Sequence, residues 1–321
     1  MKLKTKLKSN LNPKFTFENF IEGDYNRFAR SVGCAIAEDP DETSFNPLFL
    51  HSPNGLGKTH LLHAIGNQIK ENFPDKNVLY VSAEKFTQEY FEAIKSDIMN
   101  CFLEFYKNLV DVLILDDINK LSGQTGTQSE LLSIFNHFLQ NDKRIIFSSG
   151  KHPVDLTEIE IPLLNRFKSG IVAELATPSM ETRVEILKNK IKNSKIKVAE
   201  DAIVCIAENV STNIFELEGF LNTISATATF SKRAITLDLA DEVLKKYCKK
   251  PGMKLIDEKS VLDVDNKEVF LKLIRRLHSI DYVMEDVIRI RRYGDRHGFT
   301  ITKEEAKKLS DIILGMTENK G

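Results

Sequence analysis

Short apolar runs alternate with stretches of helical apolar spacing along the first half of the chain. The apolar runs predict strands within residues 48–50, 77–86, 110–121, 144–153 and 159–175. Between them, apolar residues recur three and four positions apart, which predicts helices within residues 61–65, 86–105 and 129–140. Strands and helices that alternate in this way predict an α/β fold, a three-layer αβα core on a mostly parallel sheet.

The beginning of the chain predicts a tail and one helix. Residues 1–13 are basic and predict a flexible tail. Residues 15–38 contain a helix signal, with Gly23 or Asp24 as the cap. The apolar face predicted for this helix consists of Phe28, Val32, Ala35 and Ile36.

From Pro178 onward the pattern is helical. Ser179 is placed to cap the first of several amphipathic helices, which predict a small bundle over residues 177–250. Pro251 and Gly252 end it, because neither residue continues a helix well. The predicted domains are a tail (1–13), a core (14–176), a helical lid (177–250) and a helical C-terminal region (251–321) of unknown role.

Composition adds little to this picture. The chain has 321 residues, with 45 basic against 46 acidic residues, so its overall charge does not indicate a nucleic-acid binder. A basic run at residues 289–298 fits either a solvated helix end or a phosphate contact. The basic start lacks the apolar core of a signal peptide, and no apolar run reaches membrane-span length. The four cysteines, at positions 34, 101, 205 and 248, are scattered and predict reduced, mostly packed thiols. These features predict a cytoplasmic protein without a membrane span.

A glycine-containing loop between the first strand and the following helix carries the first candidate chemistry. Residues 52–59 read SPNGLGKT, which matches the phosphate-loop pattern except that Ser52 replaces the first glycine. In such a loop, backbone N–H groups and the helix dipole hold phosphate oxygens. Lys58 would neutralise the β- and γ-phosphates, and the hydroxyl of Thr59 would complete a Mg²⁺ shell. The alternative is an ordinary strand–turn–helix with a chance Gly-Lys-Thr.

Two adjacent aspartates end a later apolar strand. Asp116 and Asp117 follow the run VDVLIL, which is a Walker B arrangement. Asp116 would hold Mg²⁺ through water, and Asp117 would orient or deprotonate the attacking water. A strand-end turn is the alternative, but parallel strands bring this pair to the same sheet edge as the phosphate loop.

Longer blocks of sequence resemble the bacterial replication initiator family DnaA over roughly residues 11–250. The blocks include LNPKFTFENFIEGDYNRFA, GLGKTHLLHAIGN, NVLYVSAEKF, DVLILDDI and NIFELEG, in the order of that family. The resemblance implies an AAA+ fold, with nucleotide between the core, the lid and a neighbouring subunit. It also implies ATP or ADP and Mg²⁺ as cofactors.

The resemblance assigns roles by position. Gly23, Asn26 and Phe28 fall in the segment near the adenine, and Arg166 falls at the arginine finger, for which a plain surface arginine is the alternative. Lys85, Lys95 and Lys107 lie in the segment that helps assembly and single-strand DNA contact in that family. The residues implied around the phosphates are Ser52, Pro53, Asn54, Gly55, Leu56, Gly57, Lys58, Thr59 and His60, with Thr59 and Asp116 at the metal.

Three residues depart from the family at the site. Phe215 stands where the lid carries a sensor arginine, Gly150 stands where the sensor strand is usually followed by Asp, and Ser52 replaces a glycine. They predict ATP binding with weakened hydrolysis or sensing, so any ATPase activity is expected to be weak. The family's C-terminal DNA-reading helix-turn-helix has no recognisable counterpart in 251–321, nor is its N-terminal oligomerisation domain recognisable.

Three functions follow as alternatives. The first is a DnaA-like ATP-binding protein in replication initiation or its control, assembling with AAA+ subunits of its own kind or DnaA. The second is a non-hydrolysing adaptor that binds DnaA or the replicative helicase without reading origin DNA. In the third, residues 251–321 are a diverged origin-binding domain. Replication-origin DNA, single- or double-stranded, is an expected partner in the first and third.

Overall fold

The computed structural model describes residues 7–192 and 197–247. The chain divides into two units, residues 1–246 and 247–321, and the description concerns the first unit together with the helix end at Tyr247. The predicted C-terminal region 251–321, with its basic run, and Cys248 lie outside the described residues. The domain borders stay predictions.

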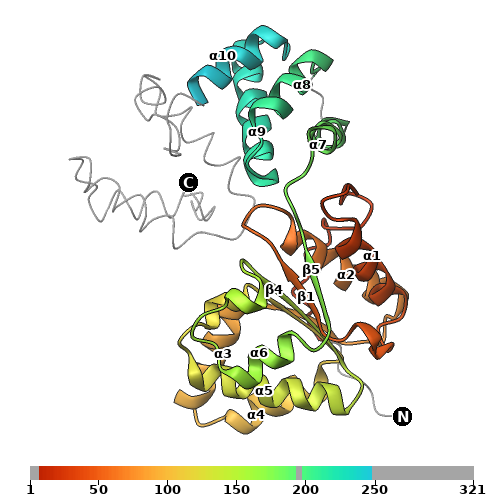
Figure 1. Ribbon diagram of the computed structural model, residues 1–321, viewed down its shortest axis with the longest axis vertical. Coiled ribbons are helices and arrows are strands. Elements are labelled where there is room, and N and C mark those ends of the chain that lie inside the picture. Colours follow the sequence, from red (N-terminus) through yellow and green to blue (C-terminus); the bar gives the residue numbers. More distant parts are fainter. Residues whose placement is uncertain (1–6, 193–196, 248–321) are drawn as a thin grey trace, which may run out of the picture. The chain divides into compact units, whose positions relative to one another are not determined.

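A five-stranded parallel sheet forms the centre of the core (Figure 1). The strand order is β2-β3-β4-β1-β5, which confirms the predicted α/β fold with a parallel sheet. The strands are β1 (Leu48–His51), β2 (Val78–Ser82), β3 (Val112–Asp116), β4 (Arg144–Ser149) and β5 (Ile171–Glu174). Strands β3 and β4 are buried along their whole length, which explains their continuous apolar runs.

Alternate residues of the strands point to opposite faces of the sheet and pack into two separate hydrophobic cores. Leu48, Leu50 and Ile114 pack under α1 (Arg27–Glu38) and α2 (Lys58–Asn72). Phe49, Leu115 and Phe147 pack on the opposite face of the sheet. The helices of that face are α3 (Ala83–Lys95), α4 (Met99–Glu104), α5 (Thr125–Gln140) and α6 (Ile161–Phe167). Short helical turns complete the core at Thr43–Phe45, Phe105–Leu109, Ile118–Leu121 and Pro153–Asp155.

Within the described part of the chain, four further helices follow β5 and have a core of their own. They are α7 (Met180–Lys192), α8 (Glu200–Asn209), α9 (Ile214–Ser231) and α10 (Leu237–Tyr247). Leu187, Ile206 and Phe220 are fully or almost fully buried among them. Ser179 caps α7 as expected, since its Oγ accepts a hydrogen bond from the Thr182 amide at 3.3 Å.

The first helix differs from its prediction in two ways. Its N-cap residue is Asn26, so the expected cap at Gly23 or Asp24 is wrong. Val32 and Ile36 are buried as predicted, but Phe28 on the same face is 58% exposed. Phe28 lies in the first turn of α1, and Val32 and Ile36, further along the helix, belong to the core that α1 shares with α2.

The structure also differs from the prediction over residues 7–13. Leu7 and Leu11 pack against the two cores of the sheet. The Ser9 carbonyl accepts a hydrogen bond from the Tyr80 amide at 2.9 Å, and the Asn12 carbonyl accepts one from Asn67 Nδ2 at 2.8 Å. Apolar side chains between the lysines therefore attach this segment to β2 and α2.

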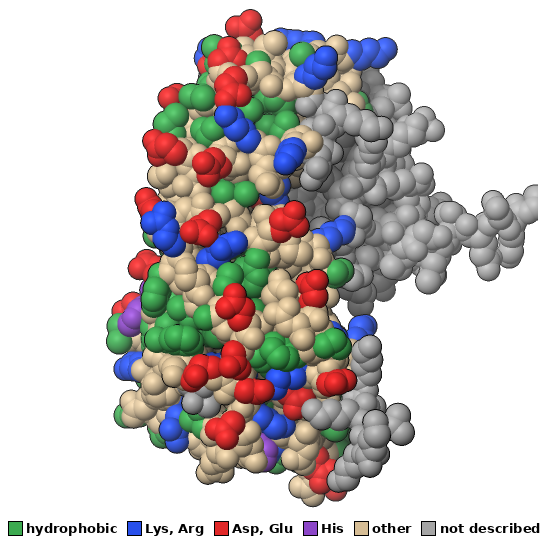
Figure 2. All heavy atoms as spheres, turned by 90° about the vertical axis from the view of Figure 1, so that its right-hand side faces the viewer, with side chains coloured by type: hydrophobic (Ala, Val, Ile, Leu, Met, Phe, Trp, Pro, Cys, Tyr) green, Lys and Arg blue, Asp and Glu red, His purple; other side chains and the backbone are tan. Residues whose placement is uncertain are grey.

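Several apolar or sulfur-containing side chains are more exposed than the pattern predicted. Phe91 and Ile94, on the predicted apolar face of α3, are both exposed. Among the described cysteines, Cys101 is exposed and Cys34 and Cys205 are half-buried, all as free thiols. On the face drawn in Figure 2, acidic and basic side chains are interspersed, in keeping with the balanced charge.

Candidate functional site

The loop between β1 and α2 has the backbone geometry that its glycines predict. Gly57 is the N-cap of α2 with φ 98°, and Gly55 has φ 84°, both in the region that favours glycine. Ser52, which replaces the first glycine of the pattern, is buried and donates its hydroxyl hydrogen to the Pro53 carbonyl at 2.9 Å. The serine therefore fits the loop without opening it.

The loop presents unpaired amides beside a buried lysine. Among the described residues, no acceptor is bonded to the N–H groups of residues 54–60, and the helix ladder begins at the Leu61 amide. Lys58 Nζ donates to the Ser52 carbonyl at 2.7 Å and the Pro53 carbonyl at 3.2 Å. Burial lowers the pKa of Lys58, while the nearby carboxylates of Asp117 and Asp116 oppose that shift. Unpaired amides at a helix N-terminus with a lysine beside them suit a phosphate.

Asp116 is the centre of the polar contacts at the sheet edge. Its Oδ2 accepts hydrogen bonds from Thr59 Oγ1 at 2.8 Å and the Tyr80 hydroxyl at 2.7 Å. Its Oδ1 accepts from the Ser148 hydroxyl and from the Asp117 amide. Because Thr59 donates its hydrogen to Asp116, its oxygen lone pairs stay available to a cation.

The donor set fits Mg²⁺, which prefers oxygen ligands and retains several waters. No group of three or more His, Cys, Asp or Glu side chains able to hold a metal occurs within the described parts of the chain. A hydroxyl and one carboxylate acting through water need no such cluster. Thr59 and Asp116 are the residues that would hold the ion.

Asp117 sits in a strained turn immediately after β3. Its φ of 57° is left-handed, and its amide donates to Ser148 Oγ at 3.0 Å. Burial raises the pKa of the Asp117 carboxyl, and the charge of Asp116 raises it further. Next to it, Asn119 Oδ1 accepts a hydrogen bond from the Gly150 amide at 2.9 Å, which joins this turn to the end of β4.

Gly150 has room for a side chain. A Cβ built at this position would lie 3.7 Å from Asn119 Oδ1 and 3.8 Å from Asn54 Oδ1, which are ordinary contacts. A side chain there would face Asn54 of the loop. Steric crowding therefore does not account for the missing aspartate.

The N-terminus of α9 contacts the loop directly. The amides of Ile214 and Phe215 donate to the Gly55 carbonyl at 3.0 and 3.1 Å. A Cβ at Gly55 would lie 2.7 Å from Asn213 Oδ1, so this close approach requires glycine. Phe215, at the predicted sensor position, is thus next to the loop, but its 75%-exposed ring carries no charge.

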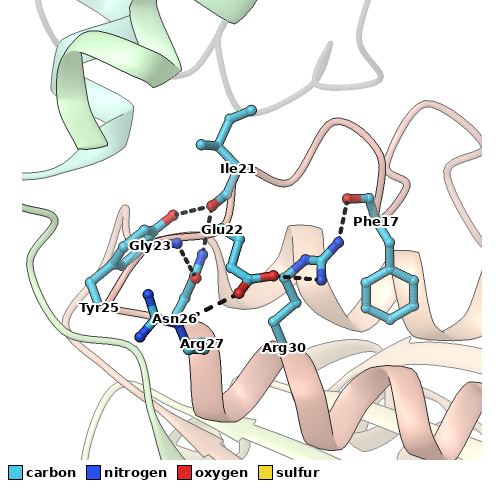
Figure 3. Close-up of polar contacts among 8 residues, drawn as sticks. All are labelled: Phe17, Ile21, Glu22, Gly23, Tyr25, Asn26, Arg27 and Arg30. Carbon is cyan, nitrogen blue, oxygen red and sulfur yellow. Dashed lines mark hydrogen bonds and ion pairs between the residues drawn. The ribbon is translucent and has the colours of Figure 1, made fainter. Parts of the chain in front are cut away.

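The segment predicted to lie near the adenine forms a closed loop around Asn26 (Figure 3). Asn26 Oδ1 accepts from the Gly23 amide at 3.0 Å, and its Nδ2 donates to the Ile21 carbonyl at 2.9 Å. Gly23 packs closely on α7, because a Cβ there would lie 2.7 Å from Thr182 Oγ1. Phe28 is outside this hydrogen-bonded group and remains exposed.

His60 contacts the N-terminal segment rather than the other loop residues. Its Nε2 lies 3.0 Å from the Thr16 carbonyl, and its ring packs against Phe15 and Phe20. Burial lowers the pKa of His60. Its side chain therefore attaches residues 15–20 to α2, while its backbone amide belongs to the unpaired set of the loop.

Arg166 lies apart from the phosphate loop, on α6. It lines a small pocket between α5 and α6 with Leu132, Asn136 and Asn165. No hydrogen bond or ion pair of its guanidinium is found among the residues that the structure describes. The structure does not bring Arg166 together with Lys58 or Asp116, and a residue that acts on a neighbouring subunit has no need of that contact.

Sequence reasoning missed four side chains of the site: His63, Tyr80, Asn119 and Ser148. Ser148 and Asn119 each lie two positions from a predicted residue, Gly150 and Asp117, so strand order and register would have indicated them. Tyr80 and His63 had no such signal. They lie on β2 and α2, and their rings pack at a tilt with centroids 4.0 Å apart.

Comparison with known proteins places these features in a family. Residues 11–174 match the family described as the bacterial DnaA ATPase domain. The chain is 49% identical over 244 residues to the chromosomal replication initiator protein DnaA of Flavobacterium psychrophilum, covering 76% of this chain and 51% of that protein. It therefore spans about half the length of this curated relative.

Two solved structures are similar. Domain III of the Thermotoga maritima replication initiation protein DnaA superposes with a TM-score of 0.71 at 36% identity, covering 75% of this chain and all of that one. A replication initiator DnaA bound to AMPPCP and single-stranded DNA superposes with a TM-score of 0.66 at 29% identity, covering 95% and 82%. None of the helices described in the present chain is long and apolar enough to cross a membrane.

From the burial of His63 we predict how the free energy of unfolding changes in acid. Burial lowers the pKa of His63 to about 4, so the folded chain keeps this ring neutral while the unfolded chain protonates it near pH 6.5. The free energy of unfolding that the neutral His63 ring contributes is complete above pH 6.5. It is lost as the pH falls from 6.5 toward 4, by up to about 3 kcal/mol. Urea unfolding at pH 7 and pH 4.5 should show a smaller acid loss for His63→Phe than for wild type.

His137→Phe is the control, because His137 is a half-buried histidine on α5 whose pKa burial lowers less than that of His63. Its acid loss should lie closer to that of wild type and exceed that of His63→Phe. If His63→Phe and wild type lose the same stability between the two pH values, the buried neutral state of His63 is wrong.

Proposed function

The chain belongs to the bacterial DnaA family, and from this we propose that it is an ATP-binding AAA+ protein of replication initiation or its control. The unpaired amides of residues 54–60 beside Lys58 are the observation that carries the proposal. The AMPPCP complex of a related DnaA supports the same ligand class. Because the protein would act on the chromosome, we place it in the cytoplasm.

We assign the residues as follows. Lys58 would leave the Ser52 and Pro53 carbonyls and turn to the β- and γ-phosphates, where its charge is better compensated. Thr59 and Asp116 would hold Mg²⁺, which neutralises phosphate charge. Asp117, with its raised pKa, would accept a proton from the attacking water more readily than an ordinary aspartate. The loop around Asn26, with Gly23, would border the adenine.

We propose slow turnover. Phe215 cannot compensate phosphate charge, and Gly150 offers no carboxylate beside Asn54. Binding needs the loop amides and Lys58, which are all in place. Hydrolysis additionally needs positive charge that stabilises the transition state, which Phe215 does not supply. Gly150 supplies no charge of either sign.

We propose that assembly with a second AAA+ subunit, either this chain or DnaA, uses Arg166. The Arg166 guanidinium has no partner among the described residues of its own chain, so it is available to pair with the γ-phosphate of a neighbour. DNA contact is proposed from the single-stranded DNA complex of a relative. Of the three candidate lysines, Lys85 pairs with Glu89 and Lys107 with Ser133, which leaves Lys95 as the best placed for a phosphate.

The adaptor function remains as a second candidate, favoured by the exposed, uncharged Phe215 beside the loop. An adaptor would bind nucleotide for structure and present its surface to DnaA or the replicative helicase. It would not need the charged sensors that hydrolysis requires. Turnover and assembly measurements distinguish the two candidates.

Removing the lysine tests nucleotide binding. Lys58→Ala should weaken binding of a fluorescent ATP analogue roughly 10- to 100-fold, because a charge-assisted hydrogen bond is worth about 1.5–3 kcal/mol. Lys70→Ala, near the other end of α2, should bind as wild type does. Equal affinity of Lys58→Ala and wild type would contradict the proposed site.

Restoring the lid charge tests slow turnover. Phe215→Arg should raise phosphate release from ATP roughly tenfold or more, because a guanidinium near the γ-phosphate stabilises the transition state. Phe230→Arg adds the same charge at the other end of α9, and its rate should stay at the wild-type value. Rapid hydrolysis by the wild-type protein alone would show that the departures do not limit turnover.

Size-exclusion chromatography with ATP and with ADP tests assembly. The wild-type protein should elute earlier with ATP, and Arg166→Ala should abolish that shift while leaving nucleotide affinity unchanged. Arg233→Ala, in an exposed ion pair with Glu242, is the control and should keep the shift. Identical elution of wild type with both nucleotides would rule out self-assembly and favour the adaptor.

A further inference from the structure

We propose that Tyr80 is a positioning residue that fixes the Asp116 carboxylate for the metal–nucleotide complex. The inference rests on the proposed nucleotide site and adds to it a residue from the edge strand β2. The Tyr80 hydroxyl donates a hydrogen bond to Asp116, and the proposed effect passes through that carboxylate.

The hydrogen bonds of Asp116 divide unequally between its two oxygens. Oδ1 is held within its own sheet, by the Ser148 hydroxyl of β4 and the Asp117 amide. Oδ2 has two hydroxyl partners, Thr59 at 2.8 Å and Tyr80 at 2.7 Å. Thr59 is itself a predicted metal ligand, so Tyr80 is the partner of Oδ2 that the metal does not engage.

The position of the Tyr80 ring is determined from several directions. Strand pairing sets Tyr80 opposite Ile114, two residues before Asp116 on the neighbouring strand. The ring packs at a tilt of 33° against His63 of α2, with centroids 4.0 Å apart, and the Phe15 ring packs against His63 with centroids 5.5 Å apart. The Asn12 amide donates to His63 Nδ1 at 3.3 Å, which holds the imidazole in turn.

Through these contacts residues 12–15 support the site indirectly. They hold His63, His63 supports the Tyr80 ring, and the Tyr80 hydroxyl holds Asp116 Oδ2. Partners that orient a ligating carboxylate typically change metal affinity 10- to 100-fold when removed. Asp116 is expected to act through water, so the lower end of this range applies.

The experiment compares nucleotide affinity with Mg²⁺ and with EDTA in the full chain. For wild type and Tyr80→Phe, a fluorescent ATP analogue is titrated under both conditions, and the ratio of the two affinities measures the metal contribution. Tyr80→Phe keeps the ring and its packing against His63 and removes the hydroxyl. It should bind as wild type does in EDTA, and its Mg²⁺ enhancement should fall about tenfold.

Tyr106→Phe is the matched control. The Tyr106 hydroxyl also donates to a carboxylate, Glu89 Oε2 at 2.6 Å, within the core on the other face of the sheet. It should keep the full Mg²⁺ enhancement even if it lowers thermal stability. A loss of enhancement in both variants would indicate general destabilisation and overturn the proposal.

The outcomes separate this inference from the proposed function. If wild type binds the analogue with a clear Mg²⁺ enhancement and Tyr80→Phe keeps it, the role of Tyr80 is wrong and the nucleotide site stands. If Tyr80→Phe loses affinity equally with Mg²⁺ and with EDTA, its role is structural and the inference also fails. If wild type binds no nucleotide under either condition, the proposed function fails first.

Discussion

The hydrogen bonding of one carboxylate, Asp116, is the constraint on which the site depends. Its two oxygens join four elements: α2 through Thr59, β2 through Tyr80, β4 through Ser148 and the turn after β3 through the Asp117 amide. A buried carboxylate is costly unless all its acceptor positions are satisfied. Thr59 lies at the start of α2, and Ser148 and the Asp117 amide lie at the carboxyl ends of their strands. Tyr80 reaches the same carboxylate from the middle of β2, so the sheet and α2 together satisfy the charge.

The loop and the lid share a second constraint, which is backbone proximity. Gly55 and Gly57 adopt positive φ, and the Gly55 carbonyl accepts two amides from the start of α9. The start of α9 thus contacts the loop through its main-chain amides, which every residue except proline supplies. The side chain at position 215 is consequently free to change without losing the contact, whereas position 55 requires glycine.

The same reasoning separates binding from sensing. In the proposed nucleotide site, binding by the backbone amides and Lys58 would not depend on the side chains of α9, whereas charge compensation at the γ-phosphate would. Gly150 has space for a side chain and Phe215 is exposed, so neither substitution is explained by packing. One similar DnaA structure holds AMPPCP and single-stranded DNA, and the site proposed for this chain rests on its own loop amides and Lys58.

The sequence by itself determined the local chemistry: the Gly-Lys-Thr loop, the aspartate pair, the capped lid helices and the alternation of strands and helices. Those features depend on backbone geometry and on neighbours a few residues apart, which sequence patterns record. Only the tertiary structure decided that Tyr80 reaches Asp116 and packs on His63, that Leu7 and Leu11 attach the N-terminal segment, and that Phe28 stays exposed. These contacts join segments up to about seventy positions apart, and strand register and helix packing, which no local pattern records, determine which side chains meet.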